Sequence, residues 1–301
     1  MTLFVGDDMQ TEALINKINI YERLMRLDKP IGILLLLWPT LWALLIAGQG
    51  KPSITIVLVF ITGTVLMRSA GCVLNDIADS QFDGQVARTQ HRPIATQSVS
   101  KKEAYALAAI LSLVAFGLVT TLNSFTIQLS FLALLVAAIY PYTKRFLAIP
   151  QAFLGVAFGF GILMAFAAVM NYIPPVAWLL FAANISWAIA YDTEYAMVDR
   201  EDDLKIGIRS SAITFGKYDV VAVMICYGLT LLILAVVGLW LWLSPFYYAG
   251  LAAAFAIAFY HYLLIKQRQP VQCFKAFMGN HWFGFAIFAG LAAHYLWVYL
   301  R

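Results

Sequence analysis

The sequence predicts an all-α membrane protein, a bundle of nine transmembrane helices with loops after the second and sixth helices that cap its cytoplasmic end. Three observations predict this fold class. Of the 301 residues, 62% are hydrophobic and 12% are charged, whereas soluble proteins carry about 25% charged residues. The apolar residues gather into nine long runs. The basic residues lie almost entirely in alternate loops between these runs.

The first segment, residues 1–29, is predicted to lie in the cytoplasm or along the membrane surface. Its opening stretch, MTLFVGDDMQ, contains two acids and no basic run, so a cleaved signal peptide is not expected. Residues 11–28 have the spacing of an interfacial helix. Its apolar face would carry Leu14, Ile18, Tyr21 and Met25, and another face Asn16, Asn19, Arg23 and Arg26.

Residues 30–301 are predicted to form a single nine-span domain. A bilayer core needs about 20 apolar residues in a helix. Runs of suitable length fall near residues 30–48, 54–74, 103–122, 125–141, 151–170, 175–194, 218–242, 246–265 and 281–300. Two pseudo-repeat halves are expected within the domain, over about 30–145 and 151–265, followed by the last span.

The basic residues predict which side of the membrane each loop occupies. All but three of the 20 lysine and arginine residues precede the first run or lie in the loops after the second, fourth, sixth and eighth runs. Loops rich in lysine and arginine remain in the cytoplasm. The N-terminus and these loops are therefore predicted to be cytoplasmic. The exceptions are Lys51, Arg68 and Arg301.

Acidic residues follow the second run at a regular spacing. In NDIADSQFDGQVARTQHRP, residues 75–93, Asn75, Asp79 and Asp83 are each four residues apart. At about 100° per residue, this spacing predicts that all three project from one face of a helix. Asp76 would point elsewhere, toward solvent or as a cap on a neighbouring group.

The same spacing recurs after the sixth run, where Tyr195, Asp199 and Asp203 are again four residues apart. The second and sixth runs would cross the membrane in the same direction. Both acidic segments are therefore predicted to end at the cytoplasmic face. This correspondence is the basis for the expected repeat with parallel halves.

Carboxylates that face one another across a cavity repel unless cations lie between them. Hard oxygen ligands in groups of two or three suit Mg²⁺ that bridges a phosphate or diphosphate. The remaining anion oxygens would be bound by nearby bases, Arg88, Arg92, Lys144 and Arg209. Each segment taken alone is more typical of a solvated helix face, but two segments with one spacing at one membrane face favour the metal site.

Arg68 stands inside the second apolar run, seven residues before Asn75 and on the same predicted helix face. An arginine at the centre of a transmembrane helix costs about 2.5–3.5 kcal/mol on insertion scales. We expect it to bind an anionic group of a small acceptor beneath the diphosphate. The alternative is that it snorkels or pairs with a nearby acid.

These segments resemble the two aspartate-rich motifs of the UbiA-type intramembrane prenyltransferases. The first motif is similar to NDIADSQFDGQVARTQHRP and the second to YDTEYAMVDREDDLKIGIRSSAITFG. The segments RLDKPIG, MRSAGCVLND and YPYTKR are similar to those of the bacterial members that act on 4-hydroxybenzoate. The resemblance covers essentially the whole chain, and no functional position departs from it. It implies a multi-pass protein of the bacterial inner membrane.

The resemblance implies transfer of a polyprenyl group from polyprenyl diphosphate to the 3-position of 4-hydroxybenzoate in ubiquinone biosynthesis, with release of diphosphate. By motif position, the catalytic and Mg²⁺-binding residues would be Asn75, Asp79, Asp83, Asp199 and Asp203. Substrate contacts would come from Arg26, Arg68, Arg88, Arg92, Lys144, Arg145, Tyr195 and Arg209. The base that removes the ring proton stays open, with an aspartate of the second motif as first candidate. No nucleic acid partner is expected.

The lipid bilayer is an expected partner, because a polyprenyl tail is nearly insoluble in water and should enter sideways from the membrane. Gly155, Gly159 and Gly161 are small enough for close helix packing, which we favour, or for a groove that holds the tail.

Two alternative functions remain open from the sequence. A related prenyltransferase with another acceptor, such as protohaem or a naphthoate, would share both motifs, because they handle only the diphosphate. A cation-coupled transporter would also use carboxylates. Transporters place them near the midplane on broken helices, often in inverted repeats, whereas here they gather at one face.

Overall fold

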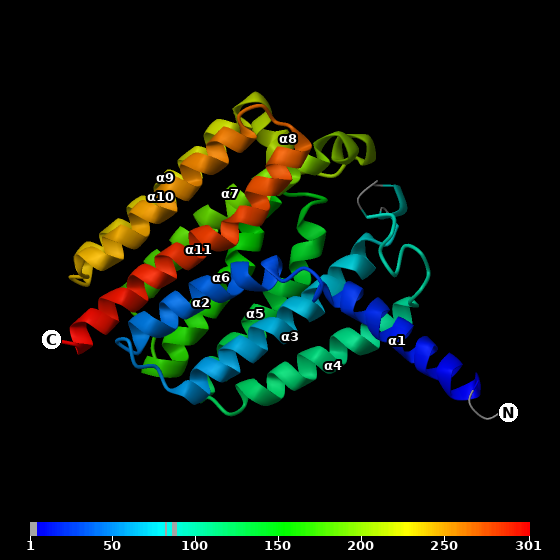
Figure 1. The fold of residues 1–301 in the computed structure, drawn as a ribbon, viewed down its shortest axis with the longest axis horizontal. Coiled ribbons are helices and arrows are strands. Elements are labelled where there is room, and N and C mark those ends of the chain that lie inside the picture. The colour runs from blue at the N-terminus through cyan, green and yellow to red at the C-terminus, as the bar shows by residue number, and fades with distance from the viewer. Residues whose placement is uncertain (1–4, 82, 86–88) are drawn as a thin grey trace.

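The computed structural model describes residues 5–81, 83–85 and 89–301, and every regular element in these ranges is helical (Figure 1). The chain begins with α1 (Val5–Met25) and the apolar α2 (Ile31–Ala47). The long helices that follow are α3 (Ile54–Asp79), α4 (Lys101–Val119), α5 (Ser124–Thr143), α6 (Pro150–Met170), α7 (Pro175–Ile206), α9 (Asp219–Trp240), α10 (Pro245–Ile265) and α11 (Pro270–Tyr299). The short elements are η1 (Asp83–Gln85), α8 (Ser211–Phe215) and η2 (Gly216–Tyr218).

Each of the nine predicted runs coincides with one of the helices from α2 to α11, so the positions of the apolar helices are confirmed. Within the described residues, seven helices are long and apolar enough to cross a membrane, and α2 is apolar but has only 17 residues. The helix α7 is not among the seven. The chain is therefore a multi-span helical membrane protein, and the number of nine spans stays a prediction.

Local signals explain where several helices begin and end. The side chain of Asn123 accepts a hydrogen bond from the backbone N–H of Thr126 at 2.9 Å, and so caps the start of α5. Proline occupies the first turn of α6, α7, α10 and α11, where its missing N–H has no helical acceptor. Gly207 ends α7 with a φ of 73°, a left-handed conformation that glycine adopts without strain.

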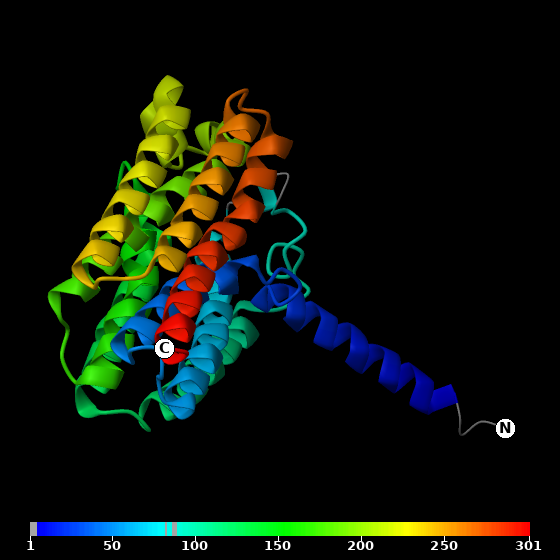
Figure 2. The ribbon, with the colours of Figure 1, turned by 60° about the vertical axis from the view of Figure 1, so that its left-hand side comes forward.

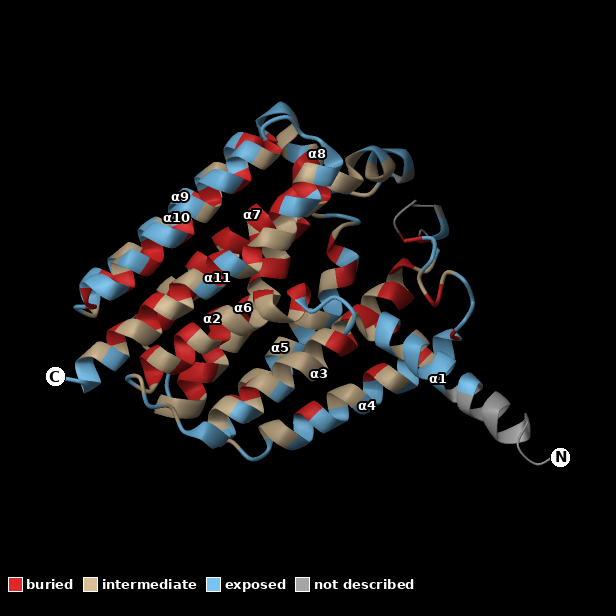
Figure 3. Cartoon of the chain, in the orientation of Figure 1, coloured by how far each residue is buried: buried red, intermediate tan, exposed pale blue. Residues whose placement is uncertain are grey.

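The main hydrophobic core lies where α2, α6, α7, α9, α10 and α11 pack together. Trp42 of α2 stacks on Trp187 of α7, with ring centroids 5.6 Å apart. Buried residues line the inner helix faces, whereas the outer faces are exposed (Figure 3). Those outer faces carry large apolar side chains such as Leu113, Leu232 and Phe255. An apolar exterior of this kind is suited to contact with lipid tails.

The glycines of α6 allow close packing, as predicted. A Cβ atom on Gly155 would lie 2.8 Å from the Cα atom of Ile185, and one on Gly159 would lie 2.6 Å from the ring of Phe181. These contacts bring α6 close to α7, the helix that carries the second acidic segment.

The helix α1 projects away from the bundle (Figure 2) and contacts it from its C-terminal half, where Lys17 and Tyr21 bind Glu103 of α4. It begins at Val5, earlier than the predicted residue 11. Leu24 is fully buried there and packs beside Tyr21 and Met25. Ile18 is exposed, so the predicted apolar face is divided between the bundle and the surroundings. The location of α1 along the membrane surface stays a prediction.

Candidate active site

Two cavities meet at the end of the bundle where α3 and α7 terminate. The larger has a volume of about 570 Å³ and extends between α2, α3, α4, α5, α6, α7 and α11. The smaller, of about 170 Å³, is lined mainly by polar side chains of α3, α5, α7 and the loops beside them. Asn75, Tyr140, Asp192 and Tyr195 line both cavities. An apolar chamber is thereby joined to a polar one.

The first acidic segment is not one continuous helix face, so this prediction is wrong in detail. The helix α3 ends at Asp79, and Asp83 begins the short helix η1. Asn75, Asp79 and Asp83 nevertheless all line the smaller cavity, because the chain turns back at the end of α3.

Asp79 and Asp83 are buried and each contacts a basic side chain. Lys144, which directly follows α5, donates a hydrogen bond to Asp79 Oδ2. The other oxygen of Asp79, Oδ1, is buried without a hydrogen-bond partner. Arg92 donates to both oxygens of Asp83 at 3.0 Å. Burial raises the pKa of the Asp83 carboxyl to about 6, although the charge of Arg92 opposes this shift.

Asp76 is buried and paired, contrary to the expectation that it points to solvent or caps a neighbour. Its exposed fraction is 1%. Its two oxygens lie 2.9 Å from Arg26 and 2.9 Å from Arg92. Arg92 also binds Asp83, so Asp76 links the residue that follows α1, the loop before α4 and the first acidic segment, beside the larger cavity.

The second acidic segment forms one helix face, as predicted. Tyr195, Asp199 and Asp203 all lie within α7 and line the smaller cavity. Asp192 lines both cavities and was missed. It precedes Tyr195 by three residues and Asp199 by seven, a spacing that places all three on one helix face. One further step of four residues toward the N-terminus reaches Tyr191, so a search that also allowed three-residue steps would have found Asp192.

The basic residues expected at the site divide into groups. Arg26, Arg68 and Arg92 line the larger cavity, and Arg92, Lys144 and Arg209 the smaller. Arg209 also donates to the backbone carbonyl of Phe146 at 2.9 Å. Arg145 lines neither cavity and donates to the carbonyl of Ala78 at 3.2 Å. Arg88 lies outside the described residues.

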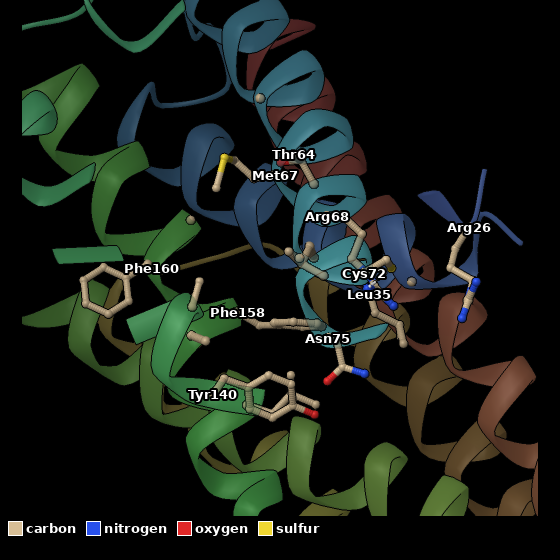
Figure 4. Close-up of a pocket in the computed structure, with 18 of the residues that line it drawn as sticks. Arg26, Leu35, Thr64, Met67, Arg68, Cys72, Asn75, Tyr140, Phe158 and Phe160 are labelled. Carbon is tan, nitrogen blue, oxygen red and sulfur yellow. Dashed lines mark hydrogen bonds between the residues drawn. The ribbon is translucent and has the colours of Figure 1, made fainter. Parts of the chain in front are cut away.

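Arg68 and Asn75 lie on the same side of α3 and face the larger cavity together with Cys72 (Figure 4). Arg68 donates a hydrogen bond to the sulfur atom of Cys72, and its Nε atom is buried with no hydrogen-bond partner. Within the part of the chain that is described, no acidic side chain lies within ion-pair distance of Arg68. This guanidinium is therefore available to an anion in the cavity.

Two tyrosines line the larger cavity near Arg68. Tyr140 of α5 lies beside Asn75 and Phe158 (Figure 4). Tyr191 of α7 has an exposed fraction of 1%, and its hydroxyl has no hydrogen-bond partner. A buried hydroxyl without a partner costs free energy, so Tyr191 is suited to bind a polar group of a molecule in the cavity.

Among the described side chains, no group of three or more His, Cys, Asp or Glu residues is arranged to hold a metal ion. The smaller cavity nevertheless contains the donors that Mg²⁺ requires, since five aspartates and one asparagine line it. The unpartnered Oδ1 atom of Asp79 is such a donor. The residues present therefore fit a hard divalent cation.

Comparison with known proteins identifies relatives over most of the chain. Residues 36–297 match the model of the UbiA prenyltransferase family. The 4-hydroxybenzoate octaprenyltransferase of Thiobacillus denitrificans is 61% identical over 284 residues, which cover 94% of this chain and 97% of that protein. The enzyme of the same name from Azoarcus sp. is 60% identical, over 94% of this chain and 99% of its own.

Solved structures share the fold at low sequence identity. The apo structure of a UbiA homologue from Aeropyrum pernix K1 has a TM-score of 0.76 and 22% identity, and the match covers 89% of this chain and 98% of that one. A UbiA homologue from Archaeoglobus fulgidus, bound to GPP and Mg²⁺, has a TM-score of 0.64 and 17% identity, with 89% and 99% covered.

Proposed function

The chain belongs to the UbiA prenyltransferase family, and on that premise we propose that it transfers a polyprenyl group from polyprenyl diphosphate to 4-hydroxybenzoate. The new carbon–carbon bond forms at the 3-position of the ring, and diphosphate is released. The observation that carries this proposal is the 60–61% identity to 4-hydroxybenzoate octaprenyltransferases over nearly their whole length. The joined polar and apolar cavities support it, because a prenyl diphosphate has one polar and one apolar end.

The smaller cavity is suited to Mg²⁺ and the diphosphate. Mg²⁺ held there would neutralise the charge that develops on the leaving diphosphate. The residues that would hold it are Asn75, Asp79, Asp83, Asp199 and Asp203, with Asp192 close by. Lys144 and Arg92 also line this cavity and would move from carboxylate oxygens toward the diphosphate oxygens. The family includes structures with bound Mg²⁺.

The larger cavity is suited to the acceptor and to the first part of the prenyl tail. Arg68 would bind the carboxylate of 4-hydroxybenzoate, and the hydroxyl of Tyr191 supplies a further polar contact. Phe158, Phe160 and Tyr140 line the same cavity. Aromatic faces favour an allylic cation and exclude the water that would capture it. Between α4 and α5 most lining residues are apolar, with Ser112 and Ser130 as polar exceptions, which supports entry of the tail from the lipid.

We also propose that the protein lies in a bacterial inner membrane with its N-terminus and active site on the cytoplasmic side. The enrichment of lysine and arginine in alternate loops supports this orientation. The carboxylate-lined cavity lies at the same end of the bundle as those loops.

The decisive experiment incubates membranes containing the protein with 4-hydroxybenzoate, Mg²⁺ and prenyl diphosphates of several lengths, and identifies products by mass spectrometry. We expect 3-polyprenyl-4-hydroxybenzoate, and no product when EDTA removes the metal. Parallel incubations with a naphthoate or protohaem test the related acceptors. Prenylation of one of these without prenylation of 4-hydroxybenzoate would contradict the proposal.

A further inference from the structure

A cluster of buried polar side chains lies behind α7, outside both cavities. Glu194 of α7, Tyr227 of α9, His261 of α10 and Asn280 of α11 each have an exposed fraction of 1% or less. None of the four lines the catalytic cavities. Burying polar side chains away from water costs desolvation free energy. The presence of four such side chains here, and the hydrogen bonds among them, therefore call for a physical explanation.

The hydroxyl of Tyr227 is the centre of this cluster. It lies 3.0 Å from Glu194 Oε1, 2.8 Å from Asn280 Oδ1 and 2.9 Å from His261 Nδ1. Asn280 in turn donates to Glu194 Oε2 at 2.8 Å and accepts from the indole N–H of Trp187 at 2.8 Å. Four helices are thereby joined through one hydroxyl and one amide.

Both ends of the hydrogen-bonded path return to α7. Glu194 and Trp187 belong to that helix and are two turns apart, and Asn280 contacts both. Two contacts at different heights restrain a helix against rotation as well as translation. A single contact, or apolar packing alone, would restrain rotation less strictly.

Rotation of α7 matters because its opposite side carries the acidic residues of the site. At 100° per residue, Glu194 lies about 160° around the helix from Asp192 and about 140° from Asp199. A carboxylate about 6 Å from the helix axis moves about 1 Å when the helix turns by 10°. Misplacement of about 1 Å can lower an enzymatic rate by about a hundredfold.

We propose that Glu194, Tyr227 and Asn280 are positioning residues, which hold α7 in the one rotation that directs Asp192, Asp199 and Asp203 into the smaller cavity. They touch neither substrate nor metal, and they act through the aspartates on the far side of the same helix. The inference rests on the proposed function only in assigning those aspartates to Mg²⁺ and diphosphate.

The number of hydrogen-bond donors and acceptors in the cluster predicts which substitutions it tolerates. The single proton of the Tyr227 hydroxyl cannot be donated to Asn280 Oδ1 and Glu194 Oε1 at the same time. An amide at position 194 would donate to the Tyr227 oxygen and still accept from Asn280. Glu194→Gln should therefore preserve the network, whereas Glu194→Leu and Tyr227→Phe should break it.

The test measures binding rather than turnover alone. Purified variants in detergent are titrated with MgCl₂ plus inorganic diphosphate, and the rise in melting temperature gives the concentration for half-maximal stabilisation. We expect Tyr227→Phe and Glu194→Leu to raise this concentration about tenfold, and Glu194→Gln to leave it within about twofold of the wild-type value. The KM for the prenyl donor should rise with it, and the KM for 4-hydroxybenzoate much less.

Tyr247→Phe is the matched control. Tyr247 is equally buried and donates one hydrogen bond, to the carbonyl of Leu234 at 2.9 Å, but this bond joins α10 to α9 and not to α7. Its loss should lower the melting temperature and leave the titration midpoint unchanged.

A wild-type midpoint in folded Tyr227→Phe, or an equal shift in Tyr247→Phe, would overturn the inference. If Tyr227→Phe does not fold, the Glu194→Leu and Glu194→Gln pair carries the same test. A wild-type protein that fails to prenylate 4-hydroxybenzoate would contradict the proposed function. The titration would still decide the positioning role.

Discussion

Arg68 reaches the larger cavity from the middle of α3 because Gly32 of α2 leaves room beside it. A Cβ atom on Gly32 would lie 2.6 Å from both Nε and Nη2 of Arg68. The guanidinium therefore lies against a helix backbone, with a thiol as its hydrogen-bond acceptor. At the residue scale, this pairing of a glycine with an arginine explains how a charge is held beside α2 and directed into the larger cavity.

Replacing Arg68 by alanine should weaken binding of the aromatic acceptor and spare the donor. A charged hydrogen bond contributes about 1.5–3 kcal/mol, so we expect the KM for 4-hydroxybenzoate to rise about tenfold to a hundredfold. The KM for the prenyl diphosphate should change by less than about threefold. Steady-state kinetics with each substrate varied in turn measures both, and equal effects on the two substrates would exclude this role.

Gly32→Ala should displace Arg68 without removing its charge. We expect the KM for 4-hydroxybenzoate to rise, by less than in Arg68→Ala, because the flexible side chain can partly readjust. Gly117→Ala is the control, since a Cβ atom on that glycine of α4 meets nothing within 4 Å. Acceptor kinetics of the two variants should differ, and identical kinetics would show that Gly32 has no part in placing Arg68.

The carboxylates that line the smaller cavity come from the ends of α3 and α7, and the two helices present them in different ways. The helix α7 continues through Ile206 and presents its aspartates from one face. The helix α3 stops at Asp79, and the turn into η1 returns Asp83 to the cavity. Because η1 is held through Arg92, which binds both Asp83 and Asp76, the first acidic segment depends on its loop for its geometry.

Asp79→Asn and Asp199→Asn should each lower the prenyl-transfer rate by at least about a hundredfold, since each removes a charged oxygen donor that lines the smaller cavity. Both variants should remain folded, because asparagine has nearly the same shape. Asp202→Asn is the control on the same helix, where Asp202 pairs with Lys205 outside the cavity. Product formation and melting temperature are measured for all three.

Retention of full activity in either site variant would remove that aspartate from the metal and diphosphate site. A comparable loss in Asp202→Asn would indicate that α7 tolerates no change of charge, whatever its position.

The whole molecule combines an apolar exterior with polarity concentrated at one end. The outer faces of α4, α5, α9 and α10 expose leucine, phenylalanine and isoleucine side chains. The smaller cavity and the loops rich in basic residues share the end at which α3 and α7 terminate. A substrate with a lipid-soluble tail and a water-soluble head group matches this division.

The proposed orientation predicts the accessibility of two single cysteines placed at opposite ends. A membrane-impermeant maleimide should label Ser98→Cys only in inside-out vesicles, and Gln49→Cys only in right-side-out vesicles, in a background without the three native cysteines. Both positions are exposed, so failure to label would not follow from burial. The reverse pattern would place the active site on the periplasmic side.

The positions of the helices and the second acidic segment were predictable, because both depend on short-range periodicity. The first acidic segment was predicted incorrectly as one helix, since nothing in its four-residue spacing reports the turn after Asp79. Asp76 was predicted to face solvent or to cap a neighbouring group, because spacing within one segment does not report its contacts with other segments. Its partners, Arg26 and Arg92, come from segments distant along the chain.

By itself, the sequence determined that this protein is a bundle of apolar helices with carboxylates on two of them, because hydrophobic runs and helical spacing are local properties. Only the tertiary structure decided which carboxylates share a cavity, that Tyr191 lines the larger cavity, and that Arg68 has no acidic partner among the described residues. It also revealed the cluster around Tyr227, whose members come from four helices. Such contacts depend on how helices far apart in the chain pack together, which no local pattern encodes.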